Sequence, residues 1–230
     1  MEFQPQTGGE PFNVHARSGL QAGQRAAKGR PAGRGGRWAK RTLDVVVAGP
    51  ALVALSPLLV LIGLLIVVDT GRPVLYRQVR YGRNRVPFRV WKFRTLSPEA
   101  SLQPFRQVTA RDERITRIGR FLRRINFDEL PQLLNVLGGS MSLVGPRPHP
   151  VELDEHFEPL IAHYAQRFTV KPGMTGWAQV NGCRGETDTI AKMEQRIARD
   201  LQYLSRRSIA FDLRILALTL LSARSYRNAR

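Results

Sequence analysis

Two adjacent carboxylates, Asp128 and Glu129, stand in a segment that is otherwise basic and apolar. Three arginines precede the pair and a fourth follows it, namely Arg120, Arg123, Arg124 and Arg147. Pro146 and Pro148 fix backbone φ on either side of Arg147 and lower the entropy cost of holding its guanidinium in place. Chemistry on a phosphate requires a carboxylate that acts as a nucleophile or metal ligand. It also requires cations, such as arginines, that stabilise the negative charge on the phosphoryl oxygens.

A structural role for the acidic pair is compatible with the same residues. Asp128 could be the N-cap of a helix that ends near Leu137, with Glu129 in its first turn and Pro131 at a position whose N–H lacks an intrahelical partner. Because acidic residues are common at helix starts, capping is the simpler interpretation on local pattern alone. A helix N-terminus also favours an anionic phosphate, so the two interpretations do not exclude each other.

The segments around the pair resemble one enzyme family. The runs FDELPQL (127–133) and GSMSLVGPRP (139–148) are similar to those of the bacterial sugar transferases, monotopic phosphoglycosyl transferases that load a sugar phosphate onto a polyprenyl phosphate. Other stretches match in the same order, namely Lys40-Arg41 with Asp44, Ser56-Pro57, Lys92-Phe93-Arg94-Thr95, and PGMTGWAQV at 172–180. The resemblance covers about Trp38 to the C-terminus, and with it capping alone is a poor explanation of Asp128.

The resemblance implies an activity. Such an enzyme moves a hexose 1-phosphate unit from a UDP-sugar to undecaprenyl phosphate, releases UMP and starts an exopolysaccharide or surface glycan, which downstream glycosyltransferases could extend. It implies that Asp128 attacks the β-phosphorus and forms an aspartyl phosphosugar intermediate, which the polyprenyl phosphate then attacks. Mg²⁺ is the expected cofactor, held by Asp128, Glu129 and substrate oxygens. The candidate phosphate contacts are Lys92, Arg94, Arg123, Arg124 and Arg147.

The overall charge restricts the partners. The chain has 36 Lys and Arg against 18 Asp and Glu, a formal charge of +18, which favours a polyanionic partner such as nucleic acid, an anionic membrane surface or a phosphorylated substrate. The single cysteine, Cys183, excludes an intrachain disulfide and fits a reducing compartment. His149, His156 and His163 have a spacing that resembles no metal site, so we interpret them as surface or packing residues.

A long apolar run indicates a membrane helix. Residues 45–68 contain no charged side chain over about 24 positions, the length expected of such a helix. Pro50 and Pro57 remove backbone donors, and a kink at Pro57 would leave two halves that are too short to cross a bilayer. Because basic residues flank both ends, both ends are expected in the cytoplasm. The sequence thus predicts a re-entrant helix broken at Ser56-Pro57, with the Ser56 hydroxyl available to a freed carbonyl.

These features divide the chain into three parts. Residues 1–36 are rich in Gly, Gln, Ala and Arg and poor in large apolar side chains, which predicts a disordered basic tail suited to anionic lipid head groups. Residues 37–70 are expected to form the re-entrant membrane helix. Residues 71–230 are expected to form the catalytic domain on the cytoplasmic face of the bacterial inner membrane.

The pattern in the third part predicts an α/β fold that is mostly helical, with a small β-hairpin or sheet and amphipathic interfacial helices. Residues 74–95 indicate a hairpin that turns at residues 82–84. Residues 114–124 and 190–204 have the spacing of amphipathic helices. Residues 171–185 indicate a loop punctuated by glycines. Residues 209–221 are apolar enough either to complete the core or to lie against the bilayer.

An alternative of a different class is a non-catalytic, membrane-anchored basic protein, either a scaffold or a nucleic-acid tether. Such a protein would explain the charge and the apolar helix. It gives no reason for the Asp128-Glu129 pair beside the GPRP run at 145–148. We therefore expect an enzyme, and no nucleic-acid partner.

Overall fold

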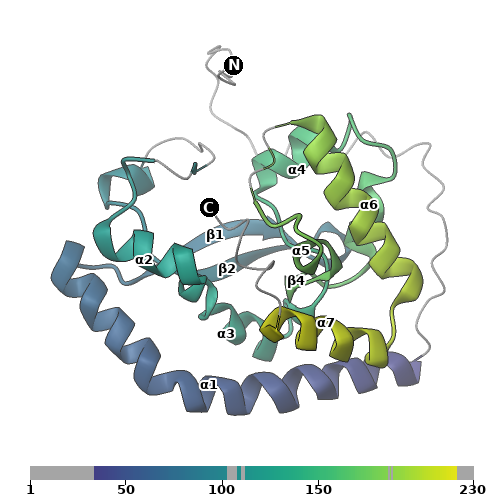
Figure 1. Ribbon diagram of the computed structural model, residues 1–230, viewed down its shortest axis with the longest axis horizontal. Helices are drawn as coiled ribbons and strands as arrows, with labels where there is room; N and C mark the ends of the chain where they lie inside the picture. The colour runs from purple at the N-terminus through teal and green to yellow at the C-terminus, as the bar shows by residue number, and fades with distance from the viewer. Residues whose placement is uncertain (1–33, 103–107, 110–111, 186, 188, 222–230) are drawn as a thin grey trace.

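Helix α1 (Arg34–Thr70) runs along one side of the fold as a long curved rod (Figure 1). The structure is a computed structural model that describes residues 34–102, 108–109, 112–185, 187 and 189–221. The predicted basic tail, residues 1–36, lies outside the described residues except for the first three positions of α1. The range predicted for the membrane helix, residues 37–70, falls entirely within α1.

Both prolines of the apolar run lie inside α1, and the helix continues through them. Pro57 has no N–H to donate to the carbonyl of Val53, four residues earlier. The Ser56 hydroxyl donates to this carbonyl instead, at 2.7 Å, as the sequence indicated. The interruption predicted at Ser56-Pro57 is therefore not a break in the helix; α1 remains one helix that curves (Figure 1).

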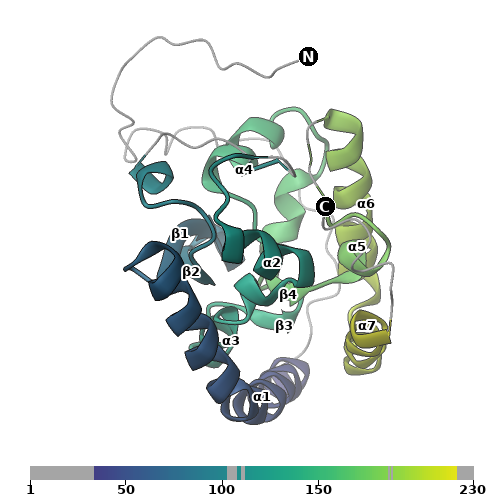
Figure 2. The ribbon, with the colours of Figure 1, turned by 60° about the vertical axis from the view of Figure 1, so that its left-hand side comes forward.

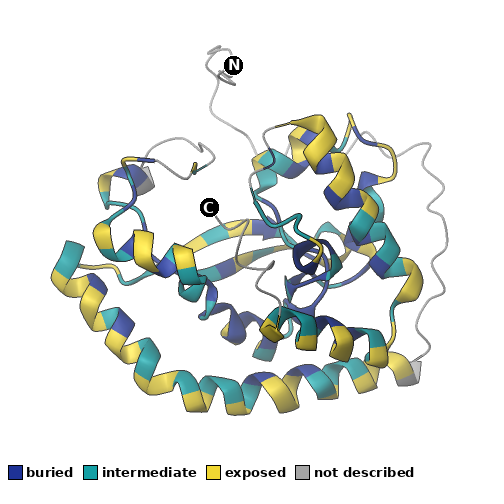
Figure 3. Ribbon diagram, viewed as in Figure 1, coloured by how far each residue is buried: buried dark blue, intermediate teal, exposed yellow. Residues whose placement is uncertain are grey.

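Most of α1 faces away from the rest of the protein. Residues Gly36–Thr70 are long and apolar enough to cross a membrane, judged by length and composition. Figure 3 shows exposed positions repeating along α1, among them the apolar residues Val46, Val53, Val60, Leu64 and Val68. An apolar surface of this extent indicates contact with a lipid or protein partner rather than with water.

The buried side of α1 makes specific contacts at both ends. Near its C-terminal end, Ile62 and Ile66 pack against Phe93 and Leu122. Near its N-terminal end, the buried carboxylate of Asp44 accepts hydrogen bonds from the Ser142 hydroxyl at 2.9 Å and the Leu143 N–H at 3.0 Å. These polar contacts fix the position of α1 relative to the globular part of the chain.

The predicted hairpin is confirmed. Strand β1 (Leu75–Tyr81) pairs antiparallel with β2 (Pro87–Phe93), in the register that places Leu75 opposite Phe93. The turn includes the short 3-10 helix η1 (Arg83–Arg85), in which Asn84 has φ 56°, a left-handed conformation that asparagine tolerates.

A second sheet lies where the sequence indicated only a loop. Strand β3 (Ser142–Val144) pairs in parallel with β4 (Gly173–Thr175), which is followed by the one-turn helix α5 (Trp177–Val180). Gly145 and Gly173 allow the two segments to approach closely, because a Cβ on Gly145 would collide with the carbonyl of Lys171 and a Cβ on Gly173 with the backbone of Gly145. The prediction of a loop over residues 171–185 was therefore wrong for the first half of that segment.

The remaining helices surround the two sheets (Figures 1 and 2). They are α2 (Arg117–Ile125), α3 (Gln132–Leu137), α4 (Val151–Phe157), α6 (Ile190–Arg206) and α7 (Ile209–Leu221), with the 3-10 helices η2 (Glu99–Leu102), η3 (Phe127–Glu129) and η4 (Tyr164–Thr169). This composition confirms the predicted fold class. Helix α7 fits both interpretations of its sequence, because Ile215 is buried in the core whereas Leu220 and Leu221 are exposed.

Candidate active site

Asp128 and Glu129 lie in η3, between α2 and α3. Asn126 ends α2 in a left-handed conformation, φ 61°, and the chain turns there to place the pair inside the fold. Each residue is only 7% exposed. The N-cap of η3 is Asn126 and that of α3 is Pro131, so Asp128 caps neither helix. The capping interpretation of Asp128 is therefore wrong.

Three cations contact the Glu129 carboxylate. Lys92 Nζ donates to Oε1 at 2.7 Å, and Arg147 donates to both oxygens, at 2.5 and 2.8 Å. Arg184 Nη2 lies 3.5 Å from Oε2. Burial by itself would raise the pKa of Glu129, but Arg147 and Lys92 outweigh it and hold the pKa well below its usual range. Glu129 is therefore ionised and fixed in position.

Asp128 has the opposite environment. Among the residues that the structure describes, none donates a hydrogen bond to its carboxylate. Burial and the neighbouring charge of Glu129 raise its pKa, against the opposing effect of Lys92, Arg123 and Arg147. Two adjacent carboxyl groups whose pKa values move in opposite directions are typical of sites where the groups have different chemical roles. Asp128 keeps its oxygen lone pairs available to an electrophile or a cation.

The predicted phosphate contacts are only partly brought together. Lys92 and Arg147 meet at Glu129. Arg123 lies close enough for its charge to act on Asp128, while its Nε donates to Thr95 Oγ1 at 2.8 Å. Arg124 lies on the same helix, α2, but is exposed, and the structure describes no contact between it and the acidic pair.

Arg94 occupies a different place. Its Nη2 donates to the carbonyls of Thr70 and Gly71, at 3.1 and 2.6 Å, and to the Thr70 hydroxyl at 2.8 Å. The guanidinium thus binds the C-terminal end of α1, where helix carbonyls lack partners. Lys92 and Arg94 would share one face if the strand continued, but β2 ends at Phe93, so the alternation does not extend to Arg94.

Arg184 was not among the predicted site residues. It follows α5 in the second half of the glycine-punctuated segment, 55 positions after Glu129. A basic residue between glycines was the only local signal in the sequence, and that pattern is common in loops.

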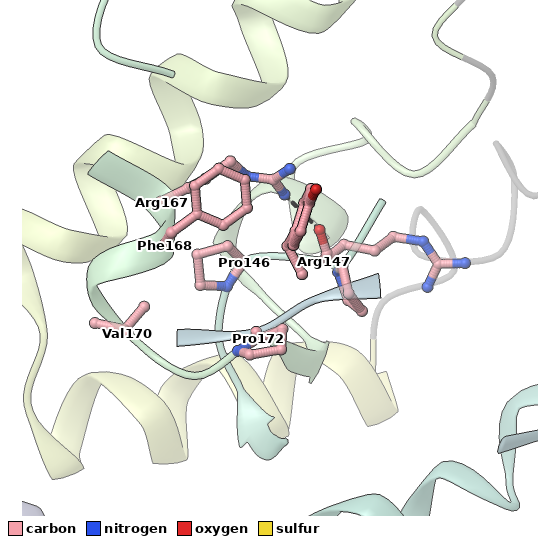
Figure 4. A pocket seen from close by; sticks show the side chains of 9 residues that line it. Pro146, Arg147, Arg167, Phe168, Val170 and Pro172 are labelled. Carbon is pink, nitrogen blue, oxygen red and sulfur yellow. Dashed lines mark hydrogen bonds between the residues drawn. The ribbon is translucent and has the colours of Figure 1, made fainter. Parts of the chain in front are cut away.

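The loop that carries Arg147 is held from behind by buried arginines. Arg167 Nη2 donates to the carbonyl of Arg147, and Arg80 Nη1 donates to the carbonyl of Pro148 at 2.9 Å. Arg167 itself pairs with Asp154 at 3.0 Å and with Asp200 at 3.3 Å. In Figure 4 the Arg167 guanidinium points toward the Arg147 backbone, while the Arg147 side chain extends away from it.

A small cavity lies behind the loop that carries Arg147. Its lining includes residues of β1 and η4, the two segments whose arginines hold that loop. Pro146, Phe168, Val170 and Pro172 form its apolar walls (Figure 4). The prolines and the hydrogen-bonded carbonyls fix the backbone that carries Arg147, and the two contacts with Glu129 fix its guanidinium. Such preorganisation favours the binding of a charged ligand.

The histidines are packing and surface residues, as the sequence indicated. His149 is buried, with Nδ1 2.9 Å from the Tyr164 hydroxyl. Burial and the nearby charge of Arg167 hold the His149 pKa well below its usual range, so the ring is neutral. His156 and His163 are exposed.

Helix α1 supports the two segments that carry the site. Arg41 donates to the carbonyls of Val136 and Leu137, at 2.6 and 2.5 Å, and so caps α3, which follows the acidic pair. Lys40 donates to the Val144 carbonyl at 3.0 Å, just before the Arg147 loop, and pairs with Asp212 at 2.8 Å. The apolar helix and the charged site are thus parts of one rigid arrangement.

A buried acidic pair among cations, joined to a long exposed apolar helix, indicates a membrane-associated protein with a charged site. The family model described as bacterial sugar transferase matches residues 35–225. The chain belongs to this family, which confirms the resemblance inferred from the sequence.

Three relatives illustrate the match. The chain is 48% identical over 183 residues to the UDP-glucose:undecaprenyl-phosphate glucose-1-phosphate transferase of Escherichia coli K12, a region that covers 80% of this chain and 39% of that protein. It is 45% identical over 190 residues to the protein of the same name from Caulobacter vibrioides, with 83% and 71% covered. It is 46% identical over 187 residues to the exopolysaccharide production protein PSS of Rhizobium leguminosarum bv. phaseoli, with 80% and 94% covered.

The lengths of these relatives differ. The matched region is 39% of the Escherichia coli and Klebsiella pneumoniae relatives and 38% of the Xanthomonas campestris relative, so the chain matches about two fifths of those proteins. It corresponds to nearly the whole of the Rhizobium protein.

Proposed function

We propose that this protein transfers a hexose 1-phosphate from a UDP-sugar to undecaprenyl phosphate, releases UMP and initiates exopolysaccharide or surface glycan synthesis. Glucose is the first sugar to test, because the Escherichia coli and Caulobacter relatives are named for UDP-glucose. The observation that carries the proposal is the contrast within the acidic pair, in which Glu129 is held by three cations while the Asp128 carboxylate accepts no hydrogen bond from the described residues.

The proposed reaction has two steps. An Asp128 oxygen attacks the β-phosphorus of the UDP-sugar, the bond from that phosphorus to the bridging oxygen breaks, and UMP leaves with the bridging oxygen. An oxygen of the polyprenyl phosphate then attacks the phosphorus of the aspartyl phosphosugar, which restores the free carboxylate and gives a polyprenyl diphosphosugar. Lys92, Arg147 and Arg123 place positive charge around the pair, where the phosphoryl oxygens would gain negative charge.

We propose Mg²⁺ as cofactor, held by Asp128 and Glu129 together with the diphosphate oxygens of the donor. Carboxylate oxygens are ligands that Mg²⁺ prefers, and it is usually bound by one or two carboxylates plus substrate phosphates. Within the described ranges, no group of three or more His, Cys, Asp or Glu side chains is placed to hold a metal. The Asp128 carboxylate, which accepts no hydrogen bond from the described residues, is open to the ion, whereas Glu129 would have to exchange one of its contacts with Lys92, Arg147 and Arg184 for it. When bound, the ion would neutralise charge on the diphosphate.

The proposed location is the cytoplasmic face of the bacterial inner membrane, with α1 in the bilayer and anionic lipids as partners. The apolar face of α1 supports it, as does Phe121 on α2, which is 57% exposed beside arginines. Residues 71–230 would then form the catalytic domain at the head-group level, and downstream glycosyltransferases would use the lipid-linked product.

Replacing Ser56 and Pro57 with Leu should convert some molecules to a spanning topology. The change restores a backbone donor at position 57 and removes the proline ring, so the curved helix can straighten. Its apolar run of about 36 Å exceeds a hydrocarbon core of about 30 Å. The N-terminal tail of those molecules would lie on the far side of the membrane, and activity would fall. To measure the topology, Gly23→Cys is introduced into a chain that also carries Cys183→Ala, and a membrane-impermeant thiol reagent is applied to intact cells. The variant with Leu at positions 56 and 57 should be labelled, and its parent should not. Labelling of the parent would show that α1 already spans the membrane.

The proposed function itself is tested by UMP release. The purified chain, with UDP-glucose, undecaprenyl phosphate and Mg²⁺, should release UMP and form a lipid-linked sugar phosphate, and EDTA should stop both. Other UDP-sugars in the same assay identify the donor. A folded chain that binds membranes and releases no UMP from any UDP-sugar would favour the scaffold alternative.

A further inference from the structure

Helix α6 presents a buried carboxylate to the network behind the Arg147 loop. Asp200 is 1% exposed, and its Oδ2 lies 3.3 Å from Arg167 Nη2. The same nitrogen, Arg167 Nη2, donates to the carbonyl of Arg147, toward which the guanidinium points in Figure 4. One nitrogen of Arg167 thus joins an anion on α6 to the backbone of a residue that contacts Glu129.

The other terminal nitrogen of Arg167 is held by a different group of residues. Arg167 Nη1 donates to Asp154 Oδ1 at 3.0 Å and to the Tyr164 hydroxyl at 3.3 Å. Because a guanidinium is a rigid planar fork, contacts at both terminal nitrogens fix its orientation. In the described part of the chain, the carboxylate that pairs with Nη2 is Asp200, and the one that pairs with Nη1 is Asp154.

The charge of Asp200 is therefore expected to matter for the Arg147 loop. Arg167 is 4% exposed, so its positive charge depends on nearby carboxylates for compensation. With Asp200 ionised, one carboxylate lies at each terminal nitrogen. Without that charge, only Asp154 would attract the guanidinium, and the contact between Nη2 and the Arg147 carbonyl would loosen.

Charged and titratable groups face Asp200 from several segments. They are Arg167 on η4, Arg196 one turn earlier on α6, Asp154 on α4 and Cys183 after α5. Burial raises the pKa of Asp200 to about 6, against the opposing effect of the two arginines. Mildly acidic pH therefore removes the charge of Asp200 without a substitution.

We propose that Asp200 is a positioning residue for Arg147 and that it acts through Arg167. The charge of Asp200 holds the Arg167 guanidinium, which holds the Arg147 carbonyl and so places the Arg147 side chain at Glu129. Asp200 is not a catalytic residue, because it acts through Arg167 rather than on the reacting atoms. The effect on turnover rests on the proposed function, whereas the effect on the loop backbone does not.

Hydrogen–deuterium exchange of the full chain in nanodiscs tests the effect on the backbone. Asp200→Asn keeps the size of the side chain and removes its charge. Exchange of the peptide 143–149, in which the Gly145 N–H donates to Thr175, should rise by roughly 10-fold, while the β1–β2 hairpin should be unchanged. Unchanged exchange of this peptide would overturn the proposal, as would an equal rise in the hairpin. Glu194→Gln, on the exposed face of α6, is the matched control and should change neither.

A pH series separates the charge of Asp200 from its packing. At pH 8, kcat/KM for UMP release should be roughly 10-fold lower in Asp200→Asn than in the wild type. The two values should converge below about pH 6, because the wild-type side chain is then also neutral. Their ratio is informative because both chains share the titration of Asp128. A ratio that is the same at every pH would overturn the role of the charge. If the wild type releases no UMP, the proposed function fails, and the exchange experiment still decides the positioning role.

A double variant tests the path through Arg167. Arg167→Lys keeps the charge and loses the fork, so Asp200→Asn should raise exchange in this background by about 2-fold or less. Fully additive effects would show that Asp200 does not act through Arg167. If Asp200→Asn does not fold, wild-type exchange at pH 5 and pH 8, corrected for the intrinsic rate, replaces it. The peptide 143–149 should loosen at pH 5, and an unchanged corrected rate would overturn the proposal.

Discussion

Asp128→Asn should bind UDP-glucose and release no UMP, with turnover reduced by roughly 10³-fold or more. An amide of the same size cannot displace the leaving group to form an acyl phosphate. The fold should survive, because the structure describes no hydrogen bond to the Asp128 carboxylate that the change would break, and because the change removes repulsion from Glu129. UMP release, circular dichroism and thermal unfolding of the purified variant check these expectations.

A folded Asp128→Asn chain with undiminished turnover would exclude the nucleophile role. Asp128→Glu provides a further control. It keeps the charge but moves the carboxylate by one methylene, and should also be severely impaired, because the attacking oxygen must lie in line with the leaving group.

Glu129→Gln should have the second largest effect, on both activity and stability. The change leaves Lys92, Arg147 and Arg184 without the charge that they share and directs an amide N–H₂ toward one of them. Removing one partner of a buried ion pair typically costs about 3–5 kcal/mol, and the loss of the ordered cations should lower turnover by about 100-fold. Thermal unfolding and UMP release measure the two effects.

Glu152→Gln is the matched control for this variant, because Glu152 is exposed on α4. It should change neither the melting temperature nor the rate. If Glu129→Gln behaved like this control, the three contacts to the Glu129 carboxylate would contribute nothing to the site.

The parts of the fold that sequence analysis predicted are those with local signals. The hairpin followed from alternation around a turn, and α2 and α6 from apolar residues at helical spacing. The parallel pair β3–β4 was not predicted, because each strand has only three residues and the partners lie about 30 positions apart. Such short strands have no periodicity that a sequence can reveal.

The site was predictable to a similar extent. The acidic pair was found because acids are out of place in a basic segment, and Arg147 because two prolines flank it. The contacts of Arg184 and Arg94 could not be predicted, because they depend on how distant segments pack together. The first is brought to Glu129 across 55 positions, and the second turns to the end of α1 because β2 stops one residue earlier.

The central claim is that Asp128 forms a covalent intermediate with the sugar phosphate. Wild-type chain incubated with UDP-[¹⁴C]glucose and Mg²⁺, without acceptor, should release UMP in an amount limited by the enzyme and retain an equal amount of label on the peptide that contains Asp128. Asp128→Asn should release none and retain none, and later addition of undecaprenyl phosphate should move the label from the wild-type chain to lipid. Release of UMP only when acceptor is present, with no label on the protein, would contradict the account and indicate direct transfer between the two substrates.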